Sequence, residues 1–279
     1  MRQVDVARLS LLAAIWGGSF IFIRVSAPAV GPLWMADIRV LLGGLALVAW
    51  LRFSGRPLGW RQHARLYAAV GFANSALPFT LYGFAGLSLS AATMAFLNAT
   101  SPMFSLLLGA ALGAERLTAR KALGLLAGAA GVALVAGPSG AGSLAPVAAC
   151  LGASFSYGVA GVIVKRYGAH APAGGIAAGS QLAAALMLAP LLPLAVPQPP
   201  SGIVIANLAA LGILASGVAL LLYFRLMRDI GATRALTVTF LVPLFAFGWA
   251  AVFLGEPLTL AIAVGGLLIL IGTLLVTRG

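Results

Sequence analysis

The chain has 279 residues, of which 62% are hydrophobic and only 8% are charged. Soluble domains carry about 25% charged residues, so this composition, with a mean hydropathy of +1.08, indicates an integral membrane protein. The formal net charge of +12 would suggest a nucleic-acid partner in a soluble protein. Here the basic residues form short clusters between apolar runs, as in cytoplasmic loops, so we expect a lipid-bilayer environment and no nucleic acid. The single cysteine, Cys150, excludes an internal disulfide bond and a cysteine-based metal cluster.

Ten apolar runs follow one another along the chain, each long enough to cross a bilayer. Such runs must be helical in lipid, because no water is present to satisfy their backbone groups. In chain order they cover residues 6–25, 32–52, 65–87, 90–114, 118–137, 142–165, 174–195, 203–226, 232–255 and 258–277. We expect Thr118 and Thr259 to cap the fifth and tenth helices by accepting an unpaired amide proton. The predicted fold class is therefore all-α and integral to the membrane, with ten transmembrane helices.

The basic residues predict the orientation of these helices. With ten spans, 15 of the 17 lysines and arginines fall on one side, and only Arg24 and Arg39 fall toward the other. Because lysine and arginine are concentrated in cytoplasmic loops, both termini are predicted to be cytoplasmic. We expect a multi-pass protein of a bacterial-type inner (plasma) membrane without a cleavable signal peptide.

Residues 91–118 and 232–259 are two copies of one pattern, offset by 141 residues without a gap. Each copy is an apolar run with one proline that ends in Glu-x-Leu-Thr. The residues paired at this offset include Gly17 with Gly158, Ser75 with Ser216, Tyr82 with Tyr223, Pro102 with Pro243 and Glu115 with Glu256. The repeat predicts two five-helix units, residues 1–138 and 139–279. With five spans each, the units insert in opposite directions, an arrangement typical of transporters whose substrate site lies near the midplane.

These features resemble the EamA-type members of the drug/metabolite transporter superfamily. The resemblance rests on the tandem repeat, on the proline and Glu-x-Leu-Thr of each half, and on the opening Trp16-Gly17-Gly18-Ser19-Phe20 with Arg24. It covers essentially the whole chain. It implies a monomer with a central cavity lined by helices one, three, four, six, eight and nine, and with helices five and ten packed together at the periphery. Family members export amino acids and other small metabolites.

Five charged residues near or inside the spans allow two interpretations each. Glu115 and Glu256 could couple transport to protons, but we favour hydrogen bonds from each helix end to the loop that starts the next helix. Asp37 and Arg39 are the charges placed clearly inside a span. Because a buried acid usually needs a positive partner, we expect Asp37 to pair with Arg24 or Arg39. The alternative for these residues is an outer gate or a contact with a substrate carboxylate.

The candidate substrate site consists of polar and aromatic residues in the middle of the predicted lining helices. An aromatic ring with a hydrogen-bonding tip suits a substrate that is partly apolar. The candidates are Trp16, Ser75, Phe79, Tyr82, Phe96, Asn98, Tyr157, Ser216, Tyr223 and Trp249. Pro102 and Pro243 are candidate hinges, with a static kink as the alternative.

Elimination then predicts the substrate class. Phosphorylated solutes need lysine or arginine deep in the site, and we expect none in the mid-span lining. Organic cations need a carboxylate or an aromatic cage, and the small multidrug relatives carry a glutamate in helix one that this chain lacks. We therefore predict export of net-neutral amino acids, aromatic ones included, by alternating access, with efflux of other small apolar metabolites or drugs as the alternative. A channel fits less well, because the two halves differ in sequence and charges that could line a pore are scarce. An intramembrane enzyme fits less well, because the sequence has no G-x-S-x-G or H-E-x-x-H motif, and no cofactor or metal is expected.

Overall fold

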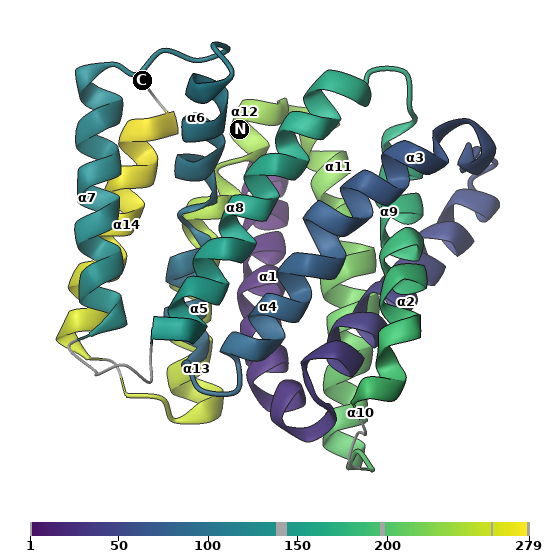
Figure 1. Ribbon diagram of the computed structural model, residues 1–279, viewed down its shortest axis with the longest axis horizontal. Helices are drawn as coiled ribbons and strands as arrows, with labels where there is room; N and C mark the ends of the chain where they lie inside the picture. The colour runs from purple at the N-terminus through teal and green to yellow at the C-terminus, as the bar shows by residue number, and fades with distance from the viewer. Residues whose placement is uncertain (1, 138–143, 196–198, 258, 278–279) are drawn as a thin grey trace.

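The computed structural model describes residues 2–137, 144–195, 199–257 and 259–277, and the regular structure of these residues is helical throughout (Figure 1). The first half contains α1 (Gln3–Val30), α2 (Pro32–Phe53), α3 (Trp60–Gly71), η1 (Phe72–Ala76), α4 (Leu77–Ala85), α5 (Ala91–Asn98), α6 (Ser101–Ala111) and α7 (Ala119–Ala136). The second half contains α8 (Leu144–Tyr167), α9 (Ala173–Leu188), η2 (Ala189–Leu194), α10 (Gly202–Ala209), η3 (Ala210–Val218), α11 (Ala219–Ile230), α12 (Ala232–Ala235), α13 (Val238–Leu254) and α14 (Leu260–Thr277).

The described residues contain eight helical segments that are long and apolar enough to cross a membrane, and α13 is a shorter apolar helix. Each predicted apolar run falls on one of these segments or on α3–η1–α4, which begins at Trp60, five residues before the predicted run. The predicted caps are confirmed, because Thr118 accepts from the Lys121 amide and Thr259 accepts from the Ile262 amide. The chain is therefore an all-helical, multi-pass membrane protein.

Helices α7 and α14 lie side by side at one edge of the molecule (Figure 1). Their backbones approach closely at glycines: a Cβ on Gly131 would lie 2.5 Å from the Gly265 carbonyl oxygen, and one on Gly265 would lie 2.8 Å from the Gly131 carbonyl oxygen. Small residues allow such close packing of membrane helices. The pairing of the fifth and tenth predicted helices at the periphery is confirmed.

Two wide helical turns occupy matching places in the two repeats. η1 and η3 are π-helical, and they contain Ser75 and Ser216, which correspond at the repeat offset. Such turns use i→i+5 hydrogen bonds and occur frequently at functional sites. Ser216 shows this geometry, since its hydroxyl donates to the carbonyl of Leu211, five residues earlier. The hydrophobic pattern did not predict these turns, because apolar spacing barely changes between α- and π-helices.

The two repeated prolines differ in their surroundings. Pro102 follows a break between α5 and α6, and the Asn98 carbonyl that a proline at this position leaves free accepts from the Ser101 hydroxyl at 2.7 Å. Pro243 lies inside α13, and the break in this copy falls earlier, between Ala235 and Val238. The helix break therefore lies at a different position relative to the proline in the two copies.

Candidate functional site

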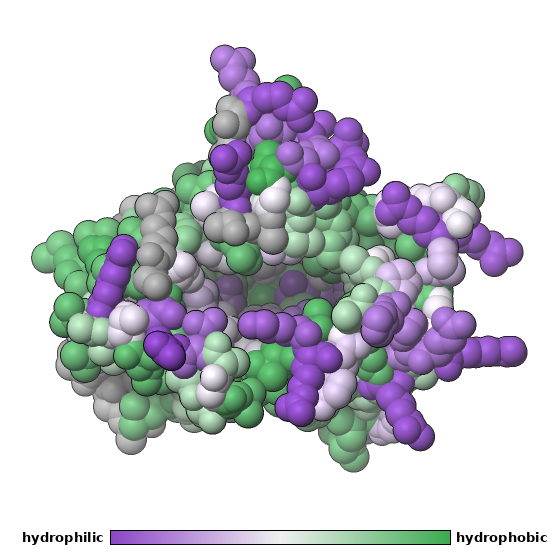
Figure 2. Space-filling view, turned by 90° about the horizontal axis from the view of Figure 1, so that it is seen from above, coloured by the Kyte–Doolittle hydropathy of each residue, from purple (hydrophilic) through white to green (hydrophobic). Residues whose placement is uncertain are grey.

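One face of the molecule is hollowed at its centre. Figure 2 views the end at which α1 starts and α14 finishes, and hydrophilic side chains surround a central depression. The exposed basic residues of this end include Arg52, Arg61, Arg116, Arg166 and Arg228. We call it the basic end. The hollow gives a route from this end toward the middle of the helices.

Tyr82 of α4 is the centre of a first group of predicted site residues. Its hydroxyl donates to Asn98 Oδ1 at 2.9 Å and lies 3.4 Å from Ser154 Oγ. Its ring stacks on Tyr157 with 6.3 Å between centroids. Tyr157 also packs on the small apolar cluster that contains Phe79. We call these five residues the Tyr82 cluster, which joins α4, α5 and α8.

Trp16 of α1 is the centre of a second group. Its indole nitrogen donates to the Ala215 carbonyl at 3.1 Å, and its ring lies 5.4 Å from that of Tyr223. Ala215 belongs to the wide turn η3, whose next carbonyl, that of Ser216, accepts from Gln181. We call Trp16, Ala215, Ser216 and Tyr223 the Trp16 cluster. The wide turn supplies backbone carbonyls to side chains from neighbouring helices.

Arg39 of α2 connects the two clusters. Its Nε donates to Ser216 Oγ at 3.0 Å, and its guanidinium carbon lies 3.6 Å from the centre of the Phe79 ring. The residue is 7% exposed. The expectation that no arginine lies deep beside the site is therefore wrong, because α2 contributes to it although α2 was not predicted to line the cavity.

The predicted ion pair of Asp37 is also wrong. Among the described residues, neither Arg24 nor Arg39 lies within ion-pairing distance of Asp37, whose Oδ1 is enclosed without a hydrogen-bond partner. Asp37 and Arg39 stand two positions apart on one helix, and residues with this spacing do not face each other.

Arg24 and Glu256 instead lie together at the end opposite to the basic end. Arg24 Nη1 donates to the Gly86 carbonyl at 2.8 Å, and its Nε lies 4.0 Å from Glu256 Oε1. Both carboxylate oxygens of Glu256 accept from the Ala91 amide, at 3.1 and 3.0 Å. Ala91 is the first residue of α5, so a carboxylate of the second repeat is held at a helix N-terminus of the first, where the helix dipole favours negative charge. The predicted partner was instead the loop that starts the next helix after Glu256.

Glu115 has a different partner at the basic end. Its Oε2 lies 3.0 Å from Lys121 Nζ, within the same repeat. This hydrogen bond and the ammonium charge hold the pKa of Glu115 below its ordinary value. A carboxyl group with a lowered pKa stays ionised at neutral pH, so Glu115 is poorly suited to carry protons.

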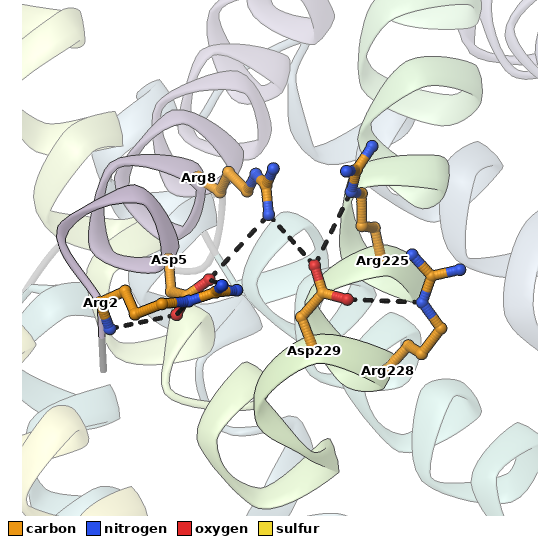
Figure 3. Close-up of polar contacts among 6 residues, drawn as sticks. All are labelled: Arg2, Asp5, Arg8, Arg225, Arg228 and Asp229. Atoms are coloured by element: carbon orange, nitrogen blue, oxygen red, sulfur yellow. Dashed lines mark hydrogen bonds and ion pairs between the residues drawn. The ribbon is translucent and has the colours of Figure 1, made fainter.

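One ion-pair group crosses between α1 and α11 at the basic end (Figure 3). Arg8 Nη1 lies 3.1 Å from Asp229 Oδ2 and 4.0 Å from Asp5 Oδ1. Asp229 also accepts a hydrogen bond from Arg228 and forms an ion pair with Arg225 at 3.7 Å, and Asp5 accepts from Arg2. Arg8 thus links the two repeats at the basic end through a partly exposed contact.

Three predicted site residues join neither cluster by a hydrogen bond or ring contact among the described residues. Phe96 packs over Gly266, where a Cβ would come within 2.5 Å of its ring, and on Phe247. The Trp249 indole nitrogen donates to the Ala14 carbonyl between α13 and α1. Ser75 is buried in η1. The structure therefore brings together seven of the ten candidates and adds Arg39, Ser154 and Ala215.

A helical membrane bundle with a polar and aromatic interior is typical of membrane transporters that bind small solutes. A sequence model of the EamA-like transporter family matches residues 7–137 and, separately, residues 144–278. The two matches cover most of the chain, which therefore belongs to the EamA-like transporter family. It is a transporter and not an enzyme.

Individual relatives agree with this assignment. The chain is 28% identical over 291 residues to YvbV, an uncharacterized transporter of Bacillus subtilis, covering 99% of this chain and 93% of the relative. It is also 28% identical to a probable terminal-alkyne amino-acid exporter of Streptantibioticus cattleyicolor, covering 97% and 92% of the two chains. A solved crystal structure matches 99% of this chain and 96% of its own with a TM-score of 0.70 at 22% identity, a similarity of fold alone.

Proposed function

We propose that this protein exports small net-neutral amino acids, those with apolar and aromatic side chains in particular. The observation that carries the proposal is the pair of clusters around Tyr82 and Trp16. Their rings offer a surface for an apolar side chain, and the Asn98 and Ser154 side chains offer hydrogen-bonding groups beside it. The printed name of the S. cattleyicolor relative, an amino-acid exporter, supports the same substrate class.

The proposed architecture has ten transmembrane helices in two inverted repeats, residues 1–138 and 139–279. The separate family matches to each half support this division. The matching wide turns η1 and η3 support it as well. An odd number of spans in each repeat places the repeats in opposite orientations, with the substrate between them near the midplane.

The proposed orientation has both termini in the cytoplasm of a bacterial-type inner membrane. The basic residues gathered at one end support it, because cytoplasmic loops carry excess lysine and arginine. With this orientation the hollow in Figure 2 faces the cytoplasm, as a substrate-loading state of an exporter requires.

The proposed mechanism is alternating access, in which the repeats rock about the site and the helices bend near Pro102 and Pro243. The protein works as a monomer. Efflux runs down the concentration gradient of the substrate, since the lowered pKa of Glu115 disfavours a proton carrier there. Efflux of other small apolar metabolites or drugs is the second candidate, favoured by the aromatic character of both clusters.

Counterflow in proteoliposomes tests the proposal. Purified protein is reconstituted with unlabelled amino acid inside, and uptake of labelled Phe, Trp, Thr and Ala is measured. We expect uptake of Phe and Trp to exceed that of Thr and Ala. Removing a ring from either cluster, by Trp16→Ala in one or Tyr82→Ala in the other, should lower Phe uptake about ten-fold, as the loss of apolar contact and ring packing predicts.

The control for these substitutions is Phe53→Ala, which removes an aromatic ring that is 92% exposed. Its uptake should equal that of the wild type. Absence of uptake for all four amino acids would reject the amino-acid substrate class and favour other metabolites.

A further inference from the structure

Arg39 is a buried cation without a counter-charge. It is 7% exposed, and none of the ion pairs among the described residues includes it. Burying an unpaired charge in a membrane protein is costly, and such residues usually mark a substrate or ion site. The face of Phe79 compensates part of the charge through a cation–π contact. The part of the positive charge that Phe79 does not compensate would be balanced by a bound anion.

The geometry fixes which part of the guanidinium is available. Nε is occupied by Ser216 Oγ. No hydrogen bond among the described residues involves Nη1 or Nη2, and neither belongs to the enclosed unpartnered atoms, which are Ser26 Oγ, Asp37 Oδ1 and Gln181 Oε1. The two terminal nitrogens therefore keep accessible surface. They form the parallel pair of donors that matches the two oxygens of a carboxylate.

The surroundings hold this fork in one position. One helical turn beyond Arg39, a Cβ on Gly43 would lie 2.8 Å from the Ser216 Cβ, so α2 and η3 pack too closely for a larger residue. Ser216 is itself fixed, because its hydroxyl donates to Leu211 and its carbonyl accepts from Gln181. A positioned guanidinium binds an anion without the entropic cost of ordering a free side chain.

Arg39 also lies where a substrate would reach it. Phe79 connects it to the Tyr82 cluster, and Ser216 connects it to the Trp16 cluster. An anion on the fork would lie beside the Phe79 ring. The sequence places Arg39 inside a membrane span. Only the packing of the helices reveals that it lies on the face of α2 that contacts η3 and α4.

We infer that Arg39 binds the carboxylate of the transported solute, and that the transporter selects monocarboxylates with an apolar or aromatic body. This assignment rests on the proposed function and names the group that the site recognises. One arginine balances one negative charge, so a monocarboxylate or an amino-acid carboxylate fits, whereas a phosphate dianion would retain unpaired charge in a low-dielectric site.

A set of phenylalanine analogues tests the assignment on the wild-type protein. Unlabelled 3-phenylpropionate keeps the carboxylate and ring but lacks the ammonium group, whereas phenylalaninamide keeps the ammonium group and ring but lacks the carboxylate. In competition with labelled Phe in proteoliposomes, 3-phenylpropionate should inhibit uptake. Phenylalaninamide should inhibit at least about ten-fold more weakly, since it leaves the fork unpaired. Equal inhibition by both analogues would overturn the assignment.

Substitution of Arg39 adds a second readout. Arg39→Gln should lower Phe uptake at least about ten-fold, and Arg39→Lys should give an intermediate rate because it keeps the charge but loses the fork. The Gln variant should unfold at a temperature no lower than the wild type, because removing an unpaired buried charge relieves its desolvation cost. A solely structural arginine would instead leave the substituted protein less stable.

The matched control is Arg61→Gln, the same change at an exposed position of α3. It should leave uptake and analogue selectivity unchanged, whereas wild-type uptake in Arg39→Gln would overturn the assignment. If the wild type transports none of the amino acids, the proposed function fails separately. Thermal stabilisation by 3-phenylpropionate then decides the site: stabilisation of the wild type but not of Arg39→Gln supports it, and equal or no stabilisation rejects it.

Discussion

Two glutamates that correspond in the repeats have different partners at the two ends of the molecule. At the end opposite to the basic end, Glu256 of the second repeat accepts from the Ala91 amide of the first repeat. At the basic end, Glu115 binds Lys121 within its own repeat. Glu115 and Glu256 correspond in sequence, but of these two only Glu256 forms a hydrogen bond to the other repeat among the described residues.

The difference coincides with the shape of the molecule. The basic end is hollowed (Figure 2). At this end the partly exposed contact between Arg8 and Asp229 links the repeats (Figure 3). The other end holds a half-buried arginine and a mostly buried carboxylate against a helix N-terminus. Since the two repeats share one sequence pattern, this asymmetry arises from the different partners that the two glutamates have in the folded chain.

Accessibility to a membrane-impermeant thiol reagent gives the largest expected contrast between the ends. In a Cys150→Ala background, a cysteine at Ser201 should be labelled in intact cells, and a cysteine at Ser54 only after the membrane is permeabilised. The reason is that Ser54 follows α2 at the basic end, which we place in the cytoplasm. The reverse pattern would invert the orientation, and an unlabelled Cys150→Ala protein is the control.

Glutamate-to-glutamine substitutions compare the two ends directly. Glu256→Gln should lower the free energy of unfolding by about 1.5–3 kcal/mol, since it weakens charge-assisted hydrogen bonds to α5. Glu115→Gln should cost under about 1 kcal/mol, because its pair with Lys121 is partly exposed and screened by water. Thermal or denaturant unfolding in detergent measures both. Equal losses would show that the two ends are not held differently.

The pH dependence of the Glu115 pair gives the smallest effect. The folded protein lowers the pKa of Glu115 from its ordinary value of 4.5. A carboxyl group with a lowered folded pKa stabilises the protein above the ordinary pKa and loses that contribution as pH falls through the folded pKa. The stability difference between wild type and Glu115→Gln should therefore be present at pH 7 and shrink below pH 4.5. A difference that grows on acidification would contradict this pairing.

The sequence by itself determined the helices, their caps and the repeat. Apolar runs of spanning length leave the backbone no alternative to the helix in lipid, and the threonine caps act within one turn. The residue types of the site could also be predicted, because Trp16, Tyr82, Tyr157 and Tyr223 are polar-tipped aromatics in apolar spans. These properties depend on local composition and spacing, which can be read from the sequence without knowing the fold.

Only the tertiary structure decided which of these residues meet. Phe96 and Trp249 have the same chemical character as the cluster residues, but the rotation of their helices turns them toward Gly266 and Ala14. The fold also placed Glu256 against Ala91, 165 positions away, and left Arg39 facing Ser216 instead of Asp37. Such contacts depend on how distant helices are rotated and packed against each other. The apolar pattern of a single helix does not predict that rotation or packing.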